Sequence, residues 1–337
     1  MRAMHVKRVV FPAVALMLLG IATALVLHAS LRRPAALLPV VIVQLQVPHS
    51  GLLQIAEAKA YFAEQGLNVT LKTVLTGNEA ISQVLRGDAD VGSTAETPVA
   101  KALAEGKQPR IIATIFSSRW SSGIVVRKDH GILQPADLKG KRIGFVFGTN
   151  THYDLETFLS FHDIALASVS MVPGMPDELV AAMLAGKLDA TSIWMPYMTQ
   201  LQQKLGDQVE TFYPKEGYAQ TFNLVVRADY VAHNRVAVDR LLRALLEAES
   251  FAETHPEQAI GIIAKASGLD SGTLRGHGDA LTYELTLKQS LLIATENQIR
   301  WYVRRGLAPG APFPDVLAAI ETEPLRALKP SRVTISK

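Results

Sequence analysis

The chain has 337 residues, of which 48% are apolar and 19% charged, and it contains no cysteine. This length is enough for two ordinary domains with filled cores. The balance of apolar and charged residues excludes disordered, collagen-like and polytopic membrane proteins. The absence of cysteine excludes disulfides, thiolate metal sites, cysteine nucleophiles and the lipid-modified cysteine of bacterial lipoproteins.

The positive charge of the chain is concentrated in its first residues. The formal net charge is +3, from 34 Lys and Arg against 31 Asp and Glu. Residues 1–33 contain no acidic residue and five basic ones, which are Arg2, Lys7, Arg8, Arg32 and Arg33. Removing these five leaves 29 basic against 31 acidic residues, so the rest of the chain has a net charge of −2. We therefore expect no nucleic-acid partner.

Residues 1–33 have the pattern of an export signal or of a membrane anchor. Basic residues precede an apolar run from Val9 to Leu27, in the order found in signal peptides. The run has 19 residues, which is enough to span a bilayer. Arg32 and Arg33 follow it, which is unusual after a cleaved signal. Both a cleaved signal peptide and a retained anchor stay open, and either one places the body in the periplasm or at the outer face of the inner membrane.

From Pro39 onward, short apolar runs alternate with segments of helical periodicity. A first unit has predicted strands over 40–46, 68–75, 89–92 and 111–116 and predicted helices over 52–65, 78–86 and 98–105. A second unit has predicted strands over 142–147, 169–172 and 190–194 and predicted helices over 151–163, 177–185 and 197–205. After these come a strand over 223–227, helices over 236–252, 256–266, 271–281 and 287–305, and an irregular surface tail from Pro309. The alternation predicts an α/β protein with mainly parallel sheets covered on both faces.

Two α/β units of similar size predict two lobes that face each other across a ligand cleft. In such sheets ligands bind beyond the carboxyl ends of the strands. The loops that follow the predicted strands are therefore the place to search for a site. They cover 46–51, 93–97, 117–122, 148–153, 194–197 and the region of Asn223.

These loops are rich in small hydroxyl and other polar side chains. The segment 148–151 lies between a strand and a helix, so its backbone N–H groups suit a small oxyanion, although the same residues would also cap the helix. Trp194 either walls the cleft or fills a lobe core. His49 and His152 are expected to donate hydrogen bonds or cap, because no other ligand lies at metal spacing. The predicted ligand-binding residues are Gln46, His49, Ser50, Thr94, Glu96, Ser117, Ser118, Gly148, Thr149, Asn150, Thr151, His152, Trp194 and Asn223.

Several short segments in this chain together resemble one family. The run AKAYFAEQGL at 58–67 resembles the opening of the periplasmic solute-binding proteins of sulfonate, taurine and nitrate ABC importers. Further similar segments are LRGDADVG at 85–92, DLKGKRI at 137–143, GTNTHY at 148–153, GKLDA at 186–190 and IWMP at 193–196. The His-Tyr pair at 152–153 is closer to the taurine binders. One departure is Ala60, where the family usually has glycine, at a position that we predict to lie within a helix.

The resemblance implies the type II periplasmic-binding-protein fold, with two α/β lobes, mixed and mainly parallel sheets, and two chain crossings. We expect the crossings near 128–132 and 214–222. The expected parts are lobe I over 38–129 and 223–308, lobe II over 130–222, and a C-terminal tail over 309–337.

The resemblance also implies a function. The protein would be the substrate-binding component of an ABC importer, a monomer without cofactor that delivers taurine, an alkanesulfonate or a similar oxyanion to a membrane permease. Glu96 would pair with the ammonium of taurine, or it would only favour the start of its helix. Alternatives are a membrane-anchored sensing domain, or a binder of nitrate, bicarbonate or another small metabolite.

We expect no enzyme activity. Thiamine-pyrimidine synthases share the fold, but they need a cysteine cluster that this chain lacks. The sequence also has no G-x-S-x-G, P-loop or H-E-x-x-H motif.

Overall fold

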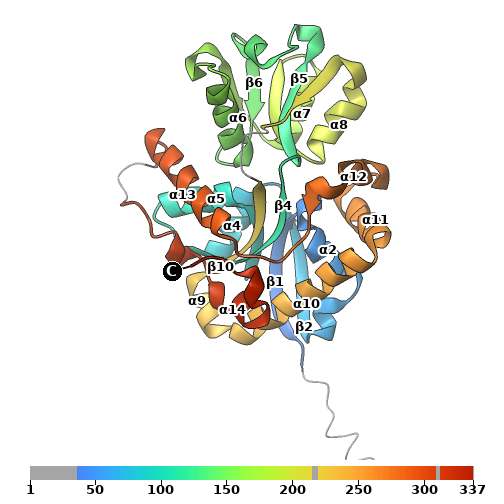
Figure 1. Cartoon of the computed structure of the whole chain (residues 1–337), viewed down its shortest axis with the longest axis vertical. Coiled ribbons are helices and arrows are strands. Elements are labelled where there is room, and N and C mark those ends of the chain that lie inside the picture. Colours follow the sequence, from blue (N-terminus) through green and yellow to red (C-terminus); the bar gives the residue numbers. More distant parts are fainter. Residues whose placement is uncertain (1–35, 215–218, 309–311, 337) are drawn as a thin grey trace, which may run out of the picture. The chain divides into compact units, whose positions relative to one another are not determined.

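The computed structural model describes residues 36–214, 219–308 and 312–336 (Figure 1). The predicted export leader at 1–33 lies outside these residues. Residues 39–337 form one compact unit built around two β-sheets. Within the described ranges, we find no helix with the length and apolar character needed to cross a membrane.

The first sheet contains strands from both ends of the chain. Its order is β11-β4-β10-β3-β1-β2. Its strands are β1 Leu38–Leu45, β2 Leu67–Val74, β3 Val91–Ala95, β4 Pro109–Ser118, β10 Gln220–Arg227 and β11 Leu281–Thr282. β1 is parallel to β3, and β10 lies antiparallel between β3 and β4, so β1, β3 and β4 run in the same direction.

The second sheet has the order β7-β6-β8-β5-β9. Its strands are β5 Ser122–Arg127, β6 Arg142–Phe145, β7 Ser170–Pro173, β8 Ala190–Trp194 and β9 Val209–Phe212. β6 is parallel to β7 and β8, and β5 is antiparallel to both of its neighbours. β5 therefore runs against the other four strands. These two mixed α/β sheets confirm the predicted fold class.

Each sheet and its helices form one lobe. The helices of lobe I are α2 Gly51–Ala58, α3 Tyr61–Glu64, α4 Gly77–Arg86, α5 Glu96–Ala104, α9 Ala228–His233, α10 Arg235–Thr254, α11 Pro256–Ser267, α12 Ser271–His277, α13 Gln289–Arg304 and α14 Thr322–Leu328. The helices of lobe II are α6 Asn150–Phe161, α7 Pro176–Leu184 and α8 Tyr197–Leu205, which surround the second sheet in Figure 1. The core of lobe II contains Ile124, Ile143, Phe145, Leu155 and Phe158.

Local sequence signals set the ends of many elements. The Thr76 hydroxyl accepts a hydrogen bond from the Glu79 backbone N–H at 3.3 Å and so caps α4. Gly87 ends the same helix with φ of +84°, a left-handed conformation that glycine adopts without strain. The prediction of a helix over 78–86 is therefore confirmed to within one residue.

The first crossing does not lie where the sequence predicts it, and after the second crossing lobe I resumes three residues earlier than predicted. β5, which the sequence analysis missed, already belongs to the second sheet, so the first crossing lies at residues 119–121 and not near 128–132. The Ser121-Ser122-Gly123 start of β5 has the composition of a turn, although all six residues of the strand are buried. The second crossing lies between β9 and β10, so lobe I resumes at Gln220 rather than at Asn223.

Two further predictions are corrected by the packing. The helix predicted over 52–65 is divided into α2 and α3, because Ala60 adopts φ of +60° between them. Residues 312–336 are not a loose surface tail: Val316, Ile320 and Leu325 are buried, and Ile320 pairs with Ile111 of β4. These side chains complete the core of lobe I, so lobe I extends past residue 308.

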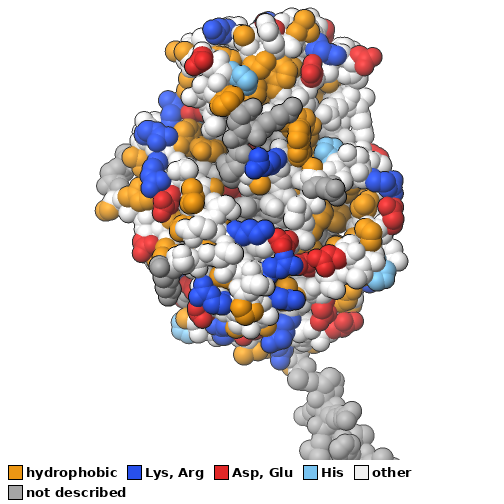
Figure 2. Space-filling view, in the orientation of Figure 1, with side chains coloured by type: hydrophobic (Ala, Val, Ile, Leu, Met, Phe, Trp, Pro, Cys, Tyr) orange, Lys and Arg blue, Asp and Glu red, His pale blue; other side chains and the backbone are white. Residues whose placement is uncertain are grey.

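Charged side chains of both signs are interspersed on the face shown in Figure 2. This distribution fits the net charge of −2 that remains without the first 33 residues.

Candidate ligand site between the two lobes

The strand directions bring the carboxyl ends of β1, β3 and β8 and the start of β10 to one place between the lobes. A cavity of about 20 Å³ lies there. Its lining residues are Leu45, Val47, His49, Gly77, Thr94, Ala95, Pro98, Thr149, Asn150, Trp194, Gln220 and Phe222. Both lobes contribute, so the cavity exists only when they face each other closely.

Five of the predicted ligand residues line this cavity. They are His49, Thr94, Thr149, Asn150 and Trp194. Ser50 and Thr151 lie behind it: the Ser50 hydroxyl donates to Leu45 O at 2.9 Å, and Thr151 Oγ1 accepts from the Val146 N–H at 3.2 Å. Gln46 lines a neighbouring, larger cavity.

The other predicted residues lie elsewhere, mostly because the strands run further than predicted. Ser117 and Ser118 belong to β4, and Asn223 belongs to β10, where its side chain accepts from the Thr114 hydroxyl at 2.7 Å. Gly148 precedes α6, and its N–H lies 3.5 Å from His152 Nδ1. The His152 ring packs against Phe145 and Trp301, outside the cavity lining.

Three helix N-termini, but no charged side chain, lie at the cavity. None of its lining residues is Asp, Glu, Lys or Arg. Three helices begin at it, since Gly77 starts α4, Ala95 precedes α5 and Asn150 starts α6. The free N–H groups and dipoles of helix N-termini favour negative charge. The arrangement therefore suits a small anion.

Hydrogen-bonding groups at the cavity have no partner within the part of the chain that the structure describes. They are both ring nitrogens of His49, Thr94 Oγ1 and Trp194 Nε1. The three side chains are at most 4% exposed, so these groups are shielded from bulk water. Leaving a buried polar group without a partner costs about 1–3 kcal/mol. A bound ligand that accepts hydrogen bonds would remove this cost.

Burial also fixes the protonation state of His49. It lowers the pKa of the imidazole to about 3, so the ring is neutral at physiological pH. A neutral imidazole donates one hydrogen bond and accepts another. The ring lies against Phe116 and Phe222, with centroids at 4.8 Å and 5.3 Å, and these contacts hold it at the cavity.

Two carboxylates lie near the cavity but do not line it. Glu96 begins α5; its Oε2 accepts from the N–H and hydroxyl of Thr221 at 2.9 and 2.8 Å, and its Oε1 accepts from Gln298 at 3.2 Å. Asp154 of α6 accepts from the Ser122 hydroxyl at 3.3 Å. Burial, and then the charge of Glu96, raises the pKa of Asp154 to about 7. Asp154 was missed from the sequence, although it lies one helical turn after Asn150.

Direct contacts hold the lobes together beside the cavity. Glu156 of α6 accepts from Trp301 Nε1 of α13 at 2.8 Å and lies 2.9 Å from Arg305 Nε. The same carboxylate lies 3.1 Å from His152 Nε2. In a further contact between the lobes, the side-chain amide of Asn78 of α4 donates to Phe147 O of lobe II at 3.1 Å. The structure thus has its two lobes closed over the cavity.

A protein-family model, described as NMT1/THI5 like, matches residues 47–259, more than half of the chain. The chain belongs to the NMT1/THI5-like family. The match covers all of lobe II and includes the ends of β3 and β8 and the start of β10 at the cavity, but it begins after β1.

Several known proteins are similar to this chain over most of their length. A binding protein of Brucella abortus is 28% identical over 247 residues, which cover 71% of this chain and 75% of the relative. The taurine-binding periplasmic protein of Escherichia coli is 26% identical over 240 residues, 68% of this chain and 74% of the relative. These relatives confirm the resemblance that the short sequence segments indicate.

A solved structure shows the same fold. The alkanesulfonate-binding protein SsuA of Xanthomonas axonopodis, bound to MOPS, superposes with a TM-score of 0.73 at 20% identity. The match covers 85% of this chain and 98% of that protein. This NMT1/THI5-like chain therefore has the periplasmic-binding-protein fold. Across its described residues, no group of three or more His, Asp or Glu side chains could hold a metal ion.

Proposed function

We propose that this protein is the extracytoplasmic substrate-binding component of an ABC importer, and that it captures a small sulfonate or a similar oxyanion between its lobes. The observation that carries the proposal is the buried cavity with unpartnered groups from His49, Thr94 and Trp194 and with three helix N-termini. A sulfonate has three acceptor oxygens and one delocalised charge, which these donors and dipoles match. Relatives that bind taurine or alkanesulfonate support this choice.

Lobe closure supplies the signal for transport in this proposal. The two crossings allow the lobes to move, and the ligand contacts residues from both of them. A permease that recognises the closed arrangement would accept the loaded protein in preference to the empty one. The chain's own residues bind, orient and enclose the ligand, and no chemical step is required.

The test is isothermal titration of the full-length protein with ethanesulfonate, taurine, nitrate and bicarbonate. We expect saturable binding of at least one sulfonate. Trp194→Phe removes the indole N–H and keeps an aromatic ring, so it should weaken binding about 5- to 20-fold, as the loss of one hydrogen bond to a charged group does. The control is Tyr230→Phe in α9, which also removes a polar group from a buried aromatic side chain outside the cavity lining and should leave binding unchanged.

The contradicting outcome is the absence of binding to every sulfonate. Binding of nitrate or bicarbonate alone would support an oxyanion-binding protein but contradict the assignment of a sulfonate as its ligand. Equal effects of Trp194→Phe and Tyr230→Phe on binding would remove Trp194 from the site.

The placement outside the cytoplasm has its own test. The basic and apolar pattern of residues 1–33 and the periplasmic relative support it. N-terminal sequencing of the exported protein separates a cleaved signal peptide from a retained anchor. A chain that stays in the cytoplasm of the intact cell would contradict both.

A further inference from the structure

Two carboxylates from opposite lobes face each other beside the cavity. Glu96 begins α5 of lobe I, and Asp154 lies in the first half of α6 of lobe II. The two helices pack against each other between the lobes. Among the described residues, Glu96 is the charged group from another element that acts on Asp154. Like charges repel in a partly buried place, so the closed arrangement is less stable when both carboxylates are ionised.

The other charged groups on and around α6 do not neutralise Asp154. On α6 itself, His152 Nε2 lies 3.1 Å from Glu156, and Glu156 also pairs with Arg305 after α13. The charge of Arg304 of α13 acts on the neighbouring Tyr153 and not on Asp154. β8 and the turn at 166–168, which also pack against α6, contain no charged residue.

The two remaining strands that contact α6 direct their charges elsewhere. Arg127 at the end of β5 pairs with Asp129, and Arg142 at the start of β6 pairs with Asp189. From β5, the group that reaches Asp154 is the neutral hydroxyl of Ser122. Asp154 therefore faces one negative charge and no positive charge among the described residues.

The Ser122 hydroxyl lies between two acceptors but has a single proton. Its Oγ is 3.3 Å from Asp154 Oδ2 and 3.2 Å from Oε1 of Gln220, the first residue of β10 in lobe I. When Asp154 is ionised, Ser122 donates to only one of them at a time. When Asp154 is protonated, its carboxyl donates to Ser122 and Ser122 donates to Gln220, so both hydrogen bonds form together. The hydrogen-bond chain between the lobes is therefore complete only when Asp154 carries a proton.

Opening of the lobes would remove both reasons for Asp154 to hold a proton. Asp154 and Ser122 belong to lobe II, whereas Glu96 and Gln220 belong to lobe I. When the lobes part, water reaches the Asp154 carboxyl and Glu96 moves away from it, so the ionised form becomes more favourable. In the closed arrangement, burial and then the charge of Glu96 raise the pKa of Asp154 from its ordinary value of 3.8 to about 7. Closure and protonation of Asp154 therefore favour each other.

On the basis of the proposed function, we propose that the protein takes up one proton, on Asp154, when its lobes close over an anionic ligand. Asp154 is a positioning residue, since it acts through Ser122 on Gln220, which lines the cavity. A ligand that favours the closed arrangement then also favours the protonated one, and the reverse holds by linkage. Affinity should therefore fall as the pH rises toward about 7, by at most about tenfold per pH unit, and level off above it.

The experiment is calorimetric titration of the full-length protein with ethanesulfonate and with nitrate between pH 5.5 and 8.5. Both anions keep their charge throughout this range, so any pH dependence belongs to the protein. We expect the affinity of the wild type to fall at least about fivefold from pH 5.5 to pH 8. Binding heats in two buffers that differ in ionisation enthalpy should show uptake of about one proton per bound anion at pH 6.

Three variants assign the proton to Asp154. Asp154→Asn is neutral at every pH and its amide donates as the protonated carboxyl does, so it should bind without proton uptake and at least about fivefold more tightly than the wild type at pH 8. A gain of affinity also shows that the variant is folded. Glu96→Gln removes the facing charge and should move the fall in affinity to lower pH. The control is Asp207→Asn, at an exposed aspartate of lobe II, which should leave the pH profile unchanged.

The outcomes separate this inference from the proposed function. Binding of ethanesulfonate with the same affinity at every pH would overturn the proton uptake and leave the sulfonate-binding function standing. A pH dependence that persists in Asp154→Asn would assign the titration to another group, such as His152, and would overturn the inference as well. A failure of both anions to bind at any pH would overturn the inference together with the proposed function.

Discussion

The two lobes are built on the same strand order but present different side chains to the ligand. Five strands of lobe I follow the order β2-β1-β3-β10-β4, and those of lobe II follow β7-β6-β8-β5-β9. In each lobe the fourth of these strands is antiparallel to its neighbours, and it lies directly beside a crossing. A strand that enters from the other lobe starts where the remaining strands end, so it has to run against them.

Equivalent polar residues hold the far ends of both sheets. Asp90 exchanges hydrogen bonds with the backbone of Val41, and Asp189 does the same with the backbone of Arg142. Each aspartate follows a helix-ending glycine by three residues, in the segments GDADV and GKLDA. The carboxylate thus joins two neighbouring parallel strands at their start, in lobe I and again in lobe II.

The antiparallel strands also repeat a sequence. The segments VVRKD at 125–129 and VVRAD at 225–229 end β5 and β10. Arg127 donates to Met183 O at 2.7 Å, and Arg227 donates to Val84 O at 3.3 Å. Each acceptor lies in the last turn of the helix that precedes the aspartate strand. The repeated arginines therefore tie that helix to the sheet in both lobes.

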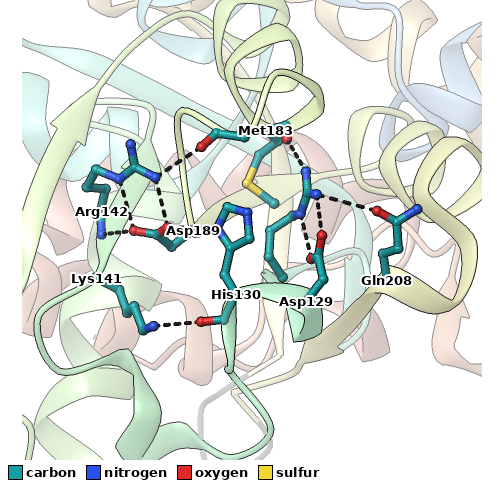
Figure 3. Close-up of polar contacts among 9 residues, drawn as sticks. Asp129, His130, Lys141, Arg142, Met183, Asp189 and Gln208 are labelled. Carbon is teal, nitrogen blue, oxygen red and sulfur yellow. Dashed lines mark hydrogen bonds and ion pairs between the residues drawn. The ribbon is translucent and has the colours of Figure 1, made fainter.

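The difference between the lobes lies in what surrounds this common framework. Asp189 also accepts from His130 Nδ1 at 2.8 Å and from Arg142 Nε and Nη2 at 3.0 and 2.9 Å, a network drawn in Figure 3. Asp90 has no such arginine or histidine among the hydrogen bonds of the described residues. At the cavity, lobe I supplies His49 and Thr94, and lobe II supplies Trp194 and the start of α6. The shared framework places the strand ends at the cavity. The few side chains that differ between the lobes then determine which ligand binds.

The largest expected effect is a difference in stability between variants of Asp189 and Asp90. Asp189→Ala should lower the free energy of unfolding by about 3 kcal/mol, because it leaves the guanidinium and backbone N–H of Arg142 and the His130 ring without their acceptor. Asp90→Ala should cost about 1 kcal/mol, since one hydrogen bond is lost. Urea denaturation measures both. Equal losses would show that the additional network of lobe II does not contribute to stability.

The same two aspartates also predict a difference in stability at acidic pH. The hydrogen bonds from Arg142 hold the pKa of Asp189 well below its ordinary value of 3.8. Because the pKa is lowered in the folded state, the ionised Asp189 side chain stabilises the fold at pH values above its ordinary pKa. This stabilisation is lost as the pH falls below that value. The difference between wild type and Asp189→Ala should therefore shrink below about pH 4. A difference that stays constant down to pH 2 would contradict this assignment.

The next largest effect is on the pH dependence of stability, and it concerns two carboxylates near the crossings, Glu96 and Asp154. Glu96 of lobe I has strong hydrogen-bond donors, whereas the pKa of Asp154 of lobe II is raised to about 7. A raised pKa lowers stability as the pH rises from about 4 to 7, because the unfolded chain releases its proton first. Asp154→Asn should remove this decline and gain about 1–2 kcal/mol at pH 8. Thermal melts across this pH range test it, with the exposed Glu210→Gln as control. An unchanged slope in Asp154→Asn would reject the effect.

A smaller effect concerns the contact by which α6 of lobe II reaches lobe I. Glu156→Gln weakens the bonds from Trp301 and Arg305 and should destabilise the closed arrangement, so ligand affinity should fall about fivefold. The control is Glu296→Gln, which removes a more exposed ion pair within α13 and should leave affinity unchanged. Titration calorimetry measures both. An unaltered affinity in Glu156→Gln would show that this contact does not assist closure.

The smallest effect concerns the left-handed residue that each lobe has after its first helix. Ala60 has φ of +60° and Asp163 has φ of +54°. Alanine is strained in this conformation by about 1–2 kcal/mol, whereas aspartate tolerates it better. Ala60→Gly should therefore gain about 0.5 kcal/mol net of the added flexibility of the unfolded chain. Asp163→Gly should gain less, and thermal melts that rank the two in the opposite order would contradict this comparison.

The sequence by itself determined the fold class and most of the elements. Strand 190–194 and helix 197–205 agree with β8 and α8 to the residue, because apolar periodicity and the flanking Gly and Pro residues are local signals. The order of short family segments also identified the family. Local signals further brought His49, Thr94, Thr149, Asn150 and Trp194 to attention, since strand ends in α/β folds converge.

Only the tertiary structure decided which polar residues meet. β5 was missed because a short, fully buried strand shows no clear periodicity, and the first crossing was misplaced with it. β9 was missed because it has only four residues. Glu96 was expected at a ligand, but the fold gives its carboxylate to Thr221 and Gln298, residues distant in the sequence. The size of the cavities and the absence of charge on their walls depend on how the two lobes close. A long-range property of that kind is set by packing between distant segments, so local sequence patterns do not contain it.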